Sequence, residues 1–178
     1  MMLPVALDLT RIPVLLIGSG ELLQKRRHQL QEAGATQMMV VEFSIPVDED
    51  AIKNAGIVMI AGLDRKTSEQ LATQAHSFGK LVNVEDVNDL CVFYFTANVR
   101  RGDLMIAVST SGASPTLARK VRDTIARYFG PEWEEYVSDM GALRRQWKKQ
   151  GLSMQEIIGK SEEHIAGLEQ SVRKKEGA

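Results

Sequence analysis

The sequence is poor in the residues that build metal sites and disulfides. It has one cysteine, Cys91, and three histidines, His28, His76 and His164, in 178 residues. A single cysteine cannot form an internal disulfide, and the histidines lack the mutual spacing of a metal site or a catalytic triad. We therefore expect no metal ligands, and a reducing compartment, the cytoplasm, is the default location.

Two further absences limit the partners. The formal net charge is −1, so no overall basic field exists to hold nucleic acid or an anionic membrane. The apolar runs are much shorter than the ~20 residues that span a bilayer, and the N-terminal stretch lacks the composition of a secretory signal. We expect neither nucleic acid nor a membrane as a partner, and any anion site must be local.

The first half of the sequence alternates strand and helix patterns. Hydrophobic residues make up 44% and charged residues 25%, which is ordinary for a folded protein. The predicted strands are continuous apolar runs, typical of parallel strands buried on both faces, at residues 14–17, 38–41, 57–61 and 81–84. Helical patterns follow the first strand from Glu21 and the third from about Ser68. This alternation predicts an α/β fold with a Rossmann-type parallel sheet.

The second half carries different signals. Two strand-like runs, 93–99 and 104–108, flank a turn and should pair as neighbours. Ser114 is a good N-cap and Pro115 is favoured at the first helical position, so a helix should run to about Tyr128. The rest of the chain is therefore expected to be helical.

Beyond that helix, an apolar stripe over 133–147 predicts a second helix that could pack against another copy of the chain. Ser153 and Glu156 have capping-box spacing and should begin a third helix. We therefore divide the chain by function. The expected parts are a Rossmann NAD-binding domain at 1–112, a helical dimerisation and substrate-side segment at 113–150, and a C-terminal helical segment at 151–178.

The turn between the first strand and its helix is the first candidate site. Gly18, Ser19 and Gly20 would let the backbone approach a pyrophosphate and aim free helix N–H groups at it. A merely structural tight turn is the alternative, and Leu23 stands where the dinucleotide fingerprint has Gly or Ala. Glu42 ends the second strand, where a carboxylate can hold ribose hydroxyls and favour NAD over NADP; a solvated glutamate is the alternative.

Asp86 is the candidate catalytic residue. It follows the fourth predicted strand, at the carboxyl edge where open α/β sheets gather their ligands. A carboxylate there could act as a base. Because Glu85 and Asp89 lie nearby, a generic acidic loop is an equally good reading of the spacing alone.

A hydroxyl-rich loop enters the helix that begins at Pro115. Such a loop can bind carboxylates or phosphates through backbone N–H groups and side-chain donors. A well-capped helix with a solvated basic face is the alternative. The candidate substrate-binding residues are Ser109, Thr110, Ser111, Gly112, Ser114 and Arg119.

These motifs together resemble the precorrin-2 dehydrogenase and siroheme synthase family. The similarity runs from the N-terminus to about Lys149, and its most specific part is the Ser-rich loop followed by Ser-Pro and Leu-Ala-Arg. The matching residues are Leu3-Pro4, Leu16-Ile17-Gly18-Ser19-Gly20, Ala33-Gly34-Ala35, Val82-Asn83-Val84-Glu85-Asp86, Phe93, Ile106-Ala107-Val108-Ser109-Thr110-Ser111-Gly112-Ala113-Ser114-Pro115 and Leu117-Ala118-Arg119.

The resemblance implies oxidation of precorrin-2 to sirohydrochlorin with NAD as hydride acceptor, in a homodimer. Asp86 matches the family's essential aspartate, a candidate base or metal-handling group, and Thr110 lies in the loop that contacts the tetrapyrrole. Ala61 and Asp64 occupy the family's run after the third strand and are expected at the cofactor. Some members also insert ferrous iron, so the resemblance leaves ferrochelatase activity open.

The chain departs from the family pattern at three places. Ser19 replaces the middle of three glycines, residues 61–64 read Ala-Gly-Leu-Asp instead of Ala-Thr-Asp-Asp, and Thr96 replaces a proline. Several of these positions face the nucleotide in the family. Two alternatives therefore stay open: a non-catalytic tetrapyrrole-binding or delivery protein, and a chelatase-only member with weakened NAD binding. A regulatory Rossmann domain of a transporter is more distant, because it leaves the Ser-rich loop unexplained.

Overall fold

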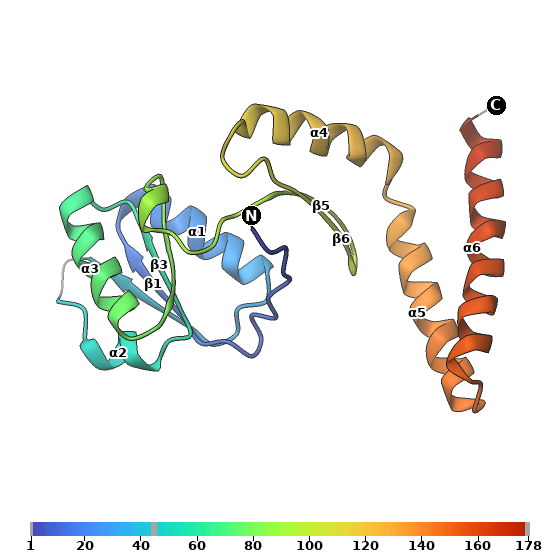
Figure 1. Ribbon diagram of the computed structural model, residues 1–178, viewed down its shortest axis with the longest axis horizontal. Coiled ribbons are helices and arrows are strands. Elements are labelled where there is room, and N and C mark those ends of the chain that lie inside the picture. Colours follow the sequence, from blue (N-terminus) through green and yellow to red (C-terminus); the bar gives the residue numbers. More distant parts are fainter. Residues whose placement is uncertain (1, 44–45, 177–178) are drawn as a thin grey trace. The chain divides into compact units, whose positions relative to one another are not determined.

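The computed structural model describes residues 2–43 and 46–176, with side chains to residue 167 (Figure 1). The chain divides into two compact units, Met1–Phe95 and Thr96–Ala178. This division falls earlier than the boundary at 112 that we expected. The reason is that the strands beyond residue 96 form a sheet of their own and do not extend the parallel sheet.

The first unit is a parallel sheet with helices on both faces, as predicted. Its four strands lie in the order β2-β1-β3-β4, and all three pairs are parallel. The chain reverses direction across the sheet between β1 and β3, and ligands bind open α/β sheets at such a switch point. The elements are β1 (Val14–Gly18), α1 (Gly20–Glu32), β2 (Met38–Glu42), α2 (Glu49–Asn54), β3 (Ile57–Ala61), α3 (Arg65–Ser77), β4 (Leu81–Val84) and the 3-10 turn η1 (Asn88–Leu90).

The two central strands are buried at every residue. Successive side chains of a strand point to opposite faces, so Leu15 and Val58 pack toward α2 and α3 while Leu16 and Met59 pack toward α1. Figure 1 shows α1 on one side of the sheet and α2 and α3 on the other. Burial on both faces explains the continuous apolar runs of the sequence.

Leu23 of α1 is fully buried in the core between α1 and the sheet. Gly or Ala at this position of the dinucleotide fingerprint lets helix and strand pack closely. In this chain the larger side chain fills that space with apolar contacts. The departure at Leu23 is therefore accommodated by core packing.

The segment after β4 differs from our prediction. Strand β5 begins at Ala97, and residues 93–96 are irregular where we predicted a strand from 93. The amide of buried Asn83 donates to the carbonyl oxygen of Phe93 at 2.9 Å, and the Phe93 side chain packs against the core on the α1 side. These contacts hold the segment beside β4, so it does not pair with the next strand. The sequence also failed to reveal α2, which is only six residues long.

The second unit combines an antiparallel hairpin with three helices, in agreement with the predicted pairing. The Arg101 side chain donates to the carbonyl oxygens of Phe129 at 2.8 Å and Ala126 at 3.3 Å, which ties the hairpin to the end of α4. The predicted capping box forms, with Ser153 N–H donating to Glu156 Oε2 at 2.8 Å. The elements are β5 (Ala97–Arg101), β6 (Leu104–Val108), α4 (Pro115–Tyr128), α5 (Trp133–Lys149) and α6 (Met154–Glu176). Within the described residues, no helix has the length and apolar character needed to cross a membrane.

Candidate active site

Three residues that we predicted at the cofactor lie side by side at the carboxyl edge of the sheet. Gly18, the last residue of β1, is in register with Glu42 at the end of β2 and with Ala61 at the end of β3. A Cβ atom at Gly18 would lie 1.9 Å from the carbonyl oxygen of Ala61. Only glycine therefore allows the two strand ends to approach this closely.

Ser19 fastens the glycine turn to the loop after β3. Its backbone N–H donates to the Ala61 carbonyl oxygen at 3.1 Å, and its hydroxyl donates to the Gly62 carbonyl oxygen at 2.6 Å. The hydroxyl makes no capping hydrogen bond to α1. The residue that replaces the family's middle glycine is thus used to hold the turn in place.

The start of α1 fits a dinucleotide phosphate. Gly20 has a φ of +63°, a left-handed conformation that favours glycine, and no atom lies within 4 Å of where its Cβ would be. The first N–H groups of a helix have no intrahelical partner, and they carry partial positive charge. An open approach, an uncapped helix start and the neighbouring Glu42 together fit the pyrophosphate and ribose of a nicotinamide dinucleotide.

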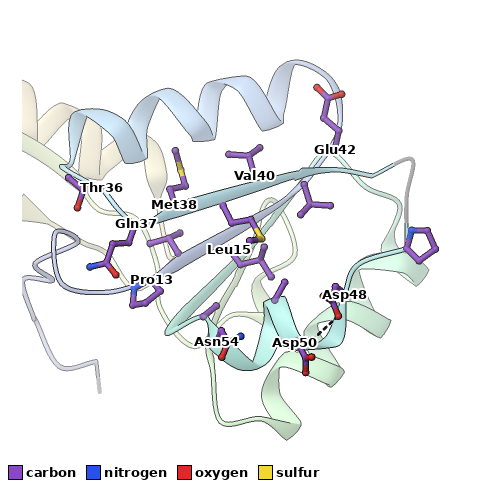
Figure 2. Close-up of a pocket in the computed structure, with 16 residues that line it drawn as sticks. Pro13, Leu15, Thr36, Gln37, Met38, Val40, Glu42, Asp48, Asp50 and Asn54 are labelled. Atoms are coloured by element: carbon purple, nitrogen blue, oxygen red, sulfur yellow. Dashed lines mark hydrogen bonds between the residues drawn. The ribbon is translucent and has the colours of Figure 1, made fainter.

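A groove runs along β2 and α2 and ends at Glu42 (Figure 2). Its floor includes apolar side chains of β1 and β2, such as Leu15 and Val41, and its α2 side carries Asp48 and Asp50. Glu42 itself is exposed. Figure 2 shows the Glu42 carboxylate on the α1 side of β2, whereas Asp48 and Asp50 lie on the α2 side.

Asp64 lies at the start of α3, and its carboxylate caps that helix. It accepts from Thr67 N–H at 3.0 Å and from the Thr67 hydroxyl at 2.6 Å. These hydrogen bonds favour the charged form and lower the pKa of Asp64. The side chain that we predicted at the cofactor therefore has a capping role, beside the loop of Gly62.

Asp86 differs from its acidic neighbours Glu85 and Asp89 in its ion-pair partners. Glu85 forms an ion pair with Arg26 of α1, and Asp89 pairs with Arg65 at 2.6 Å. Asp86 is exposed and forms no ion pair with any of the described residues. Its carboxylate is free at the carboxyl edge of the sheet, which favours a specific site over a generic acidic loop.

The backbone at Asp86 is unusual. Its φ is +60°, and among the described residues Ser111 is the other non-glycine residue with a positive φ, at 51°. Aspartate tolerates this left-handed region better than most residues, and such conformations collect at functional sites. Both residues belong to sites that we predicted from the sequence alone.

Sequence reasoning missed Arg26. Its side chain is only 10% exposed, although it belongs to the basic run Lys25-Arg26-Arg27. A signal was available, because Arg26 lies three residues after buried Leu23 and four before buried Leu30. That spacing places it on the stripe of α1 that faces the sheet.

The Ser-rich loop of the second unit is ordered by its own hydroxyl groups. Thr110 Oγ1 donates to the Ser114 carbonyl oxygen and accepts from Ser114 N–H, both at 3.1 Å. Ser114 Oγ accepts from Leu117 N–H at 3.2 Å as the predicted N-cap. Ser109, Ser111, Gly112 and Arg119 are exposed. Thr110 and Ser114 therefore shape the loop that presents the exposed residues.

The described residues contain no group of three or more His, Cys, Asp or Glu side chains placed to hold a metal ion. The thiol of Cys91 instead accepts from Val84 N–H at 3.1 Å. Burial raises the pKa of this thiol. Cys91 thus holds the loop after β4 against the end of that strand.

Comparison with known proteins agrees with this geometry. Residues 5–97 match the family described as "Putative NAD(P)-binding", and residues 101–128 match "Sirohaem biosynthesis protein central". The siroheme synthase of Methylococcus capsulatus is 34% identical over 140 residues, covering 69% of this chain and 30% of that protein. The siroheme synthase of Mannheimia succiniciproducens is 31% identical over 166 residues, and the alignment covers 84% of this chain and 35% of that protein. The chain thus spans about a third of these relatives.

A solved structure named SirC, precorrin-2 dehydrogenase, has the same fold. It matches with a TM-score of 0.70 and 18% identity, covering 95% of this chain and 100% of that one. The first unit is therefore an NAD(P)-binding domain of Rossmann type. More particularly, the chain belongs to the siroheme synthase family, and in this chain the NAD(P)-binding match precedes the sirohaem central match.

Proposed function

We propose that this protein is an NAD-dependent precorrin-2 dehydrogenase that makes sirohydrochlorin. The observation that carries the proposal is the free carboxylate of Asp86 at the sheet edge that also holds the glycine turn. The match to the sirohaem central family and the name of the solved relative of equal extent support the choice of substrate.

The reaction removes two electrons and two hydrogens from precorrin-2. One hydrogen leaves with both electrons as a hydride to the nicotinamide ring, and the other leaves as a proton. NAD, when bound, supplies the hydride acceptor. In our proposal Asp86 accepts the proton, because an exposed, unpaired carboxylate is a competent base. The products are sirohydrochlorin, NADH and a proton.

We further propose that the dinucleotide is NAD. Glu42 lies in register with Gly18, which supports a role for its carboxylate in binding the ribose hydroxyls beside the glycine turn. A 2′-phosphate on that ribose would meet the Glu42 carboxylate without a compensating cation among the residues that line the groove.

The substrate carboxylates are assigned to the Ser-rich loop and the start of α4. Ser109, Ser111 and Arg119 are exposed there, and Ser111 and Gly112 turn the backbone with φ of 51° and 84°. Exposed hydroxyl, N–H and guanidinium donors suit a tetrapyrrole that bears many carboxylates. In an otherwise nearly neutral chain, this segment offers a local anion site.

A homodimer is also part of the proposal. Leu117, Val121 and Tyr128 are exposed and recur on α4 at the spacing of one helical face. An exposed apolar stripe of this kind often marks an interface. We propose that segment 113–150 forms this interface and that the protein works in the cytoplasm.

The proposal is tested by mixing the purified protein with precorrin-2 and NAD. NADH and sirohydrochlorin should appear together in equal amounts. Folded, dimeric protein that gives neither product would reject the dehydrogenase. Calorimetry then separates the alternatives: tetrapyrrole binding without NAD binding indicates a carrier, whereas ferrous iron insertion into sirohydrochlorin without NAD indicates a chelatase.

A further inference from the structure

The guanidinium group of Arg26 contacts three side chains. One nitrogen pairs with the carboxylate of Glu85, and Nη1 donates to Gln29 Oε1 at 3.0 Å. The guanidinium carbon lies 4.0 Å from the ring centroid of Phe95. The side chains of Arg26 and Glu85 are 10% and 15% exposed. This is a fixed, almost water-free ion pair.

Such a pair is a poor source of stability. Removing two charges from water costs about as much as their attraction returns, and apolar replacements of similar size are often neutral or stabilising. Removing a single partner is costly, because it leaves a buried charge unpaired. The pair therefore fixes a geometry more than it strengthens the fold.

The geometry that the pair fixes is that of the loop after β4, residues 85–91. Glu85 directly precedes Asp86, and its N–H donates to the Ile60 carbonyl oxygen at 2.9 Å. The side chain and the backbone of Glu85 are thus both anchored. The next residue, Asp86, has a φ of +60°, a conformation that persists only where its surroundings impose it.

We infer that Arg26 is a positioning residue that acts through Glu85 to hold the left-handed turn at Asp86. The inference rests on the proposed function of Asp86. Because Arg26 belongs to the helix that starts at the glycine turn, the same α1 that receives the dinucleotide also sets the base.

The same loop offers a matched control. Arg65 and Asp89 also join a helix to this loop through an ion pair, but their side chains are 60% and 61% exposed. Exposed pairs contribute little to stability or geometry. Removing this pair should leave the Asp86 turn unchanged.

The test compares the paired variant Arg26→Met/Glu85→Leu with the control Arg65→Gln/Asp89→Asn. Two measurements are made on each full-length protein: amide hydrogen exchange at residues 85–91, and kcat and KM for NAD with precorrin-2. We expect the paired variant to exchange at least about tenfold faster in this loop, since it loses a local restraint. Its kcat should fall about 10- to 100-fold, because small misplacements of a catalytic group have effects of that size. KM for NAD should change little, and the control should match the wild type.

Unchanged exchange and unchanged kcat in the paired variant would overturn the inference, because the pair would then be only structural. Should the paired variant fold poorly, Arg26→Gln/Glu85→Gln carries the same test, since it keeps polar side chains and leaves neither charge unpaired. The triple variant Arg26→Met/Glu85→Leu/Asp86→Asn should have about the same kcat as Asp86→Asn alone, because Arg26 and Glu85 act on the reaction through Asp86. If the wild type does not turn over precorrin-2, the proposed function fails, while the exchange measurement still decides whether Arg26 positions the loop.

Discussion

The hydroxyl of Ser19 donates a hydrogen bond to the carbonyl oxygen of Gly62 at 2.6 Å, which links the turn after β1 to the loop after β3. Gly62 has a φ of +73°, and a Cβ there would lie 2.3 Å from the Ser19 carbonyl oxygen. The two loops are therefore shaped to each other. Ser19, which replaces a glycine of the family pattern, thus holds the two loops together and makes no capping hydrogen bond to α1.

This arrangement predicts the effect of Ser19→Ala. Loss of the hydroxyl removes one hydrogen bond, so the free energy of unfolding should fall by about 1 kcal/mol. The Kd for NAD should change less than about threefold, because the hydroxyl is already engaged by Gly62. Denaturant unfolding and calorimetry measure the two quantities. A large loss of NAD affinity at unchanged stability would show that the hydroxyl contacts the dinucleotide directly.

Gly18→Ala should damage both the fold and the site. The new Cβ would be placed 1.9 Å from the Ala61 carbonyl oxygen, so β1 and β3 must move apart. We expect a loss of at least about 1–3 kcal/mol in the free energy of unfolding, with loss of NAD binding. Gly159→Ala is the control, since nothing lies within 4 Å of its Cβ position and it lies within α6. That variant should be as stable as the wild type or slightly more stable. Equal behaviour of the two variants would contradict the close approach of the strand ends.

Glu42→Gln should relax the choice of dinucleotide. Removing the carboxylate at the end of β2 weakens its hydrogen bonds to the ribose and removes its repulsion of a 2′-phosphate. The ratio of NADP to NAD affinity should rise about tenfold, which corresponds to about 1.4 kcal/mol. The control is Glu32→Gln. Glu32 lies at the C-terminal end of α1, whereas the glycine turn is at the start of this helix, so the ratio should stay unchanged. Titration of each dinucleotide by calorimetry gives the ratio, and no change in Glu42→Gln would place the ribose elsewhere.

Asp64 makes a pH-dependent contribution to stability. Its pKa is lowered in the folded state by the hydrogen bonds from Thr67, so its stabilisation is fully present above the unfolded-state pKa and is lost as the pH falls through the folded-state pKa. Asp64→Ala should therefore have a lower Tm than the wild type at neutral pH. The two Tm values should converge in strongly acid solution. A difference in Tm that does not depend on pH would exclude the charged cap.

The sequence predicted the sheet well because β1 and β3 are buried on both faces, and burial of that kind leaves an unbroken apolar run. The turn at Gly18, the cap at Ser114 and the capping box at Ser153 are local chemistry, so they were readable too. The start of β5 was not, because Asn83 holds Phe93 beside β4, and this contact joins separate segments.

The candidate site shows the same limit. Asp86 could be singled out by its place after β4, but its distinction from Glu85 and Asp89 depends on Arg26 and Arg65, which lie far away in the sequence. Likewise, the register that sets Gly18 beside Glu42 follows from the pairing of β1 with β2. Ion pairs and register join distant segments, and a local pattern carries no record of them.

The most direct test of the account is the turnover of precorrin-2 by the wild type and by Asp86→Asn. Asparagine tolerates the left-handed backbone at this position and removes only the basic carboxylate, so the Tm should be preserved. The wild type should form NADH and sirohydrochlorin in equal amounts, and Asp86→Asn should reduce kcat by about 10²- to 10⁴-fold, the usual contribution of a general base. Wild-type turnover in the folded Asp86→Asn protein would contradict the account.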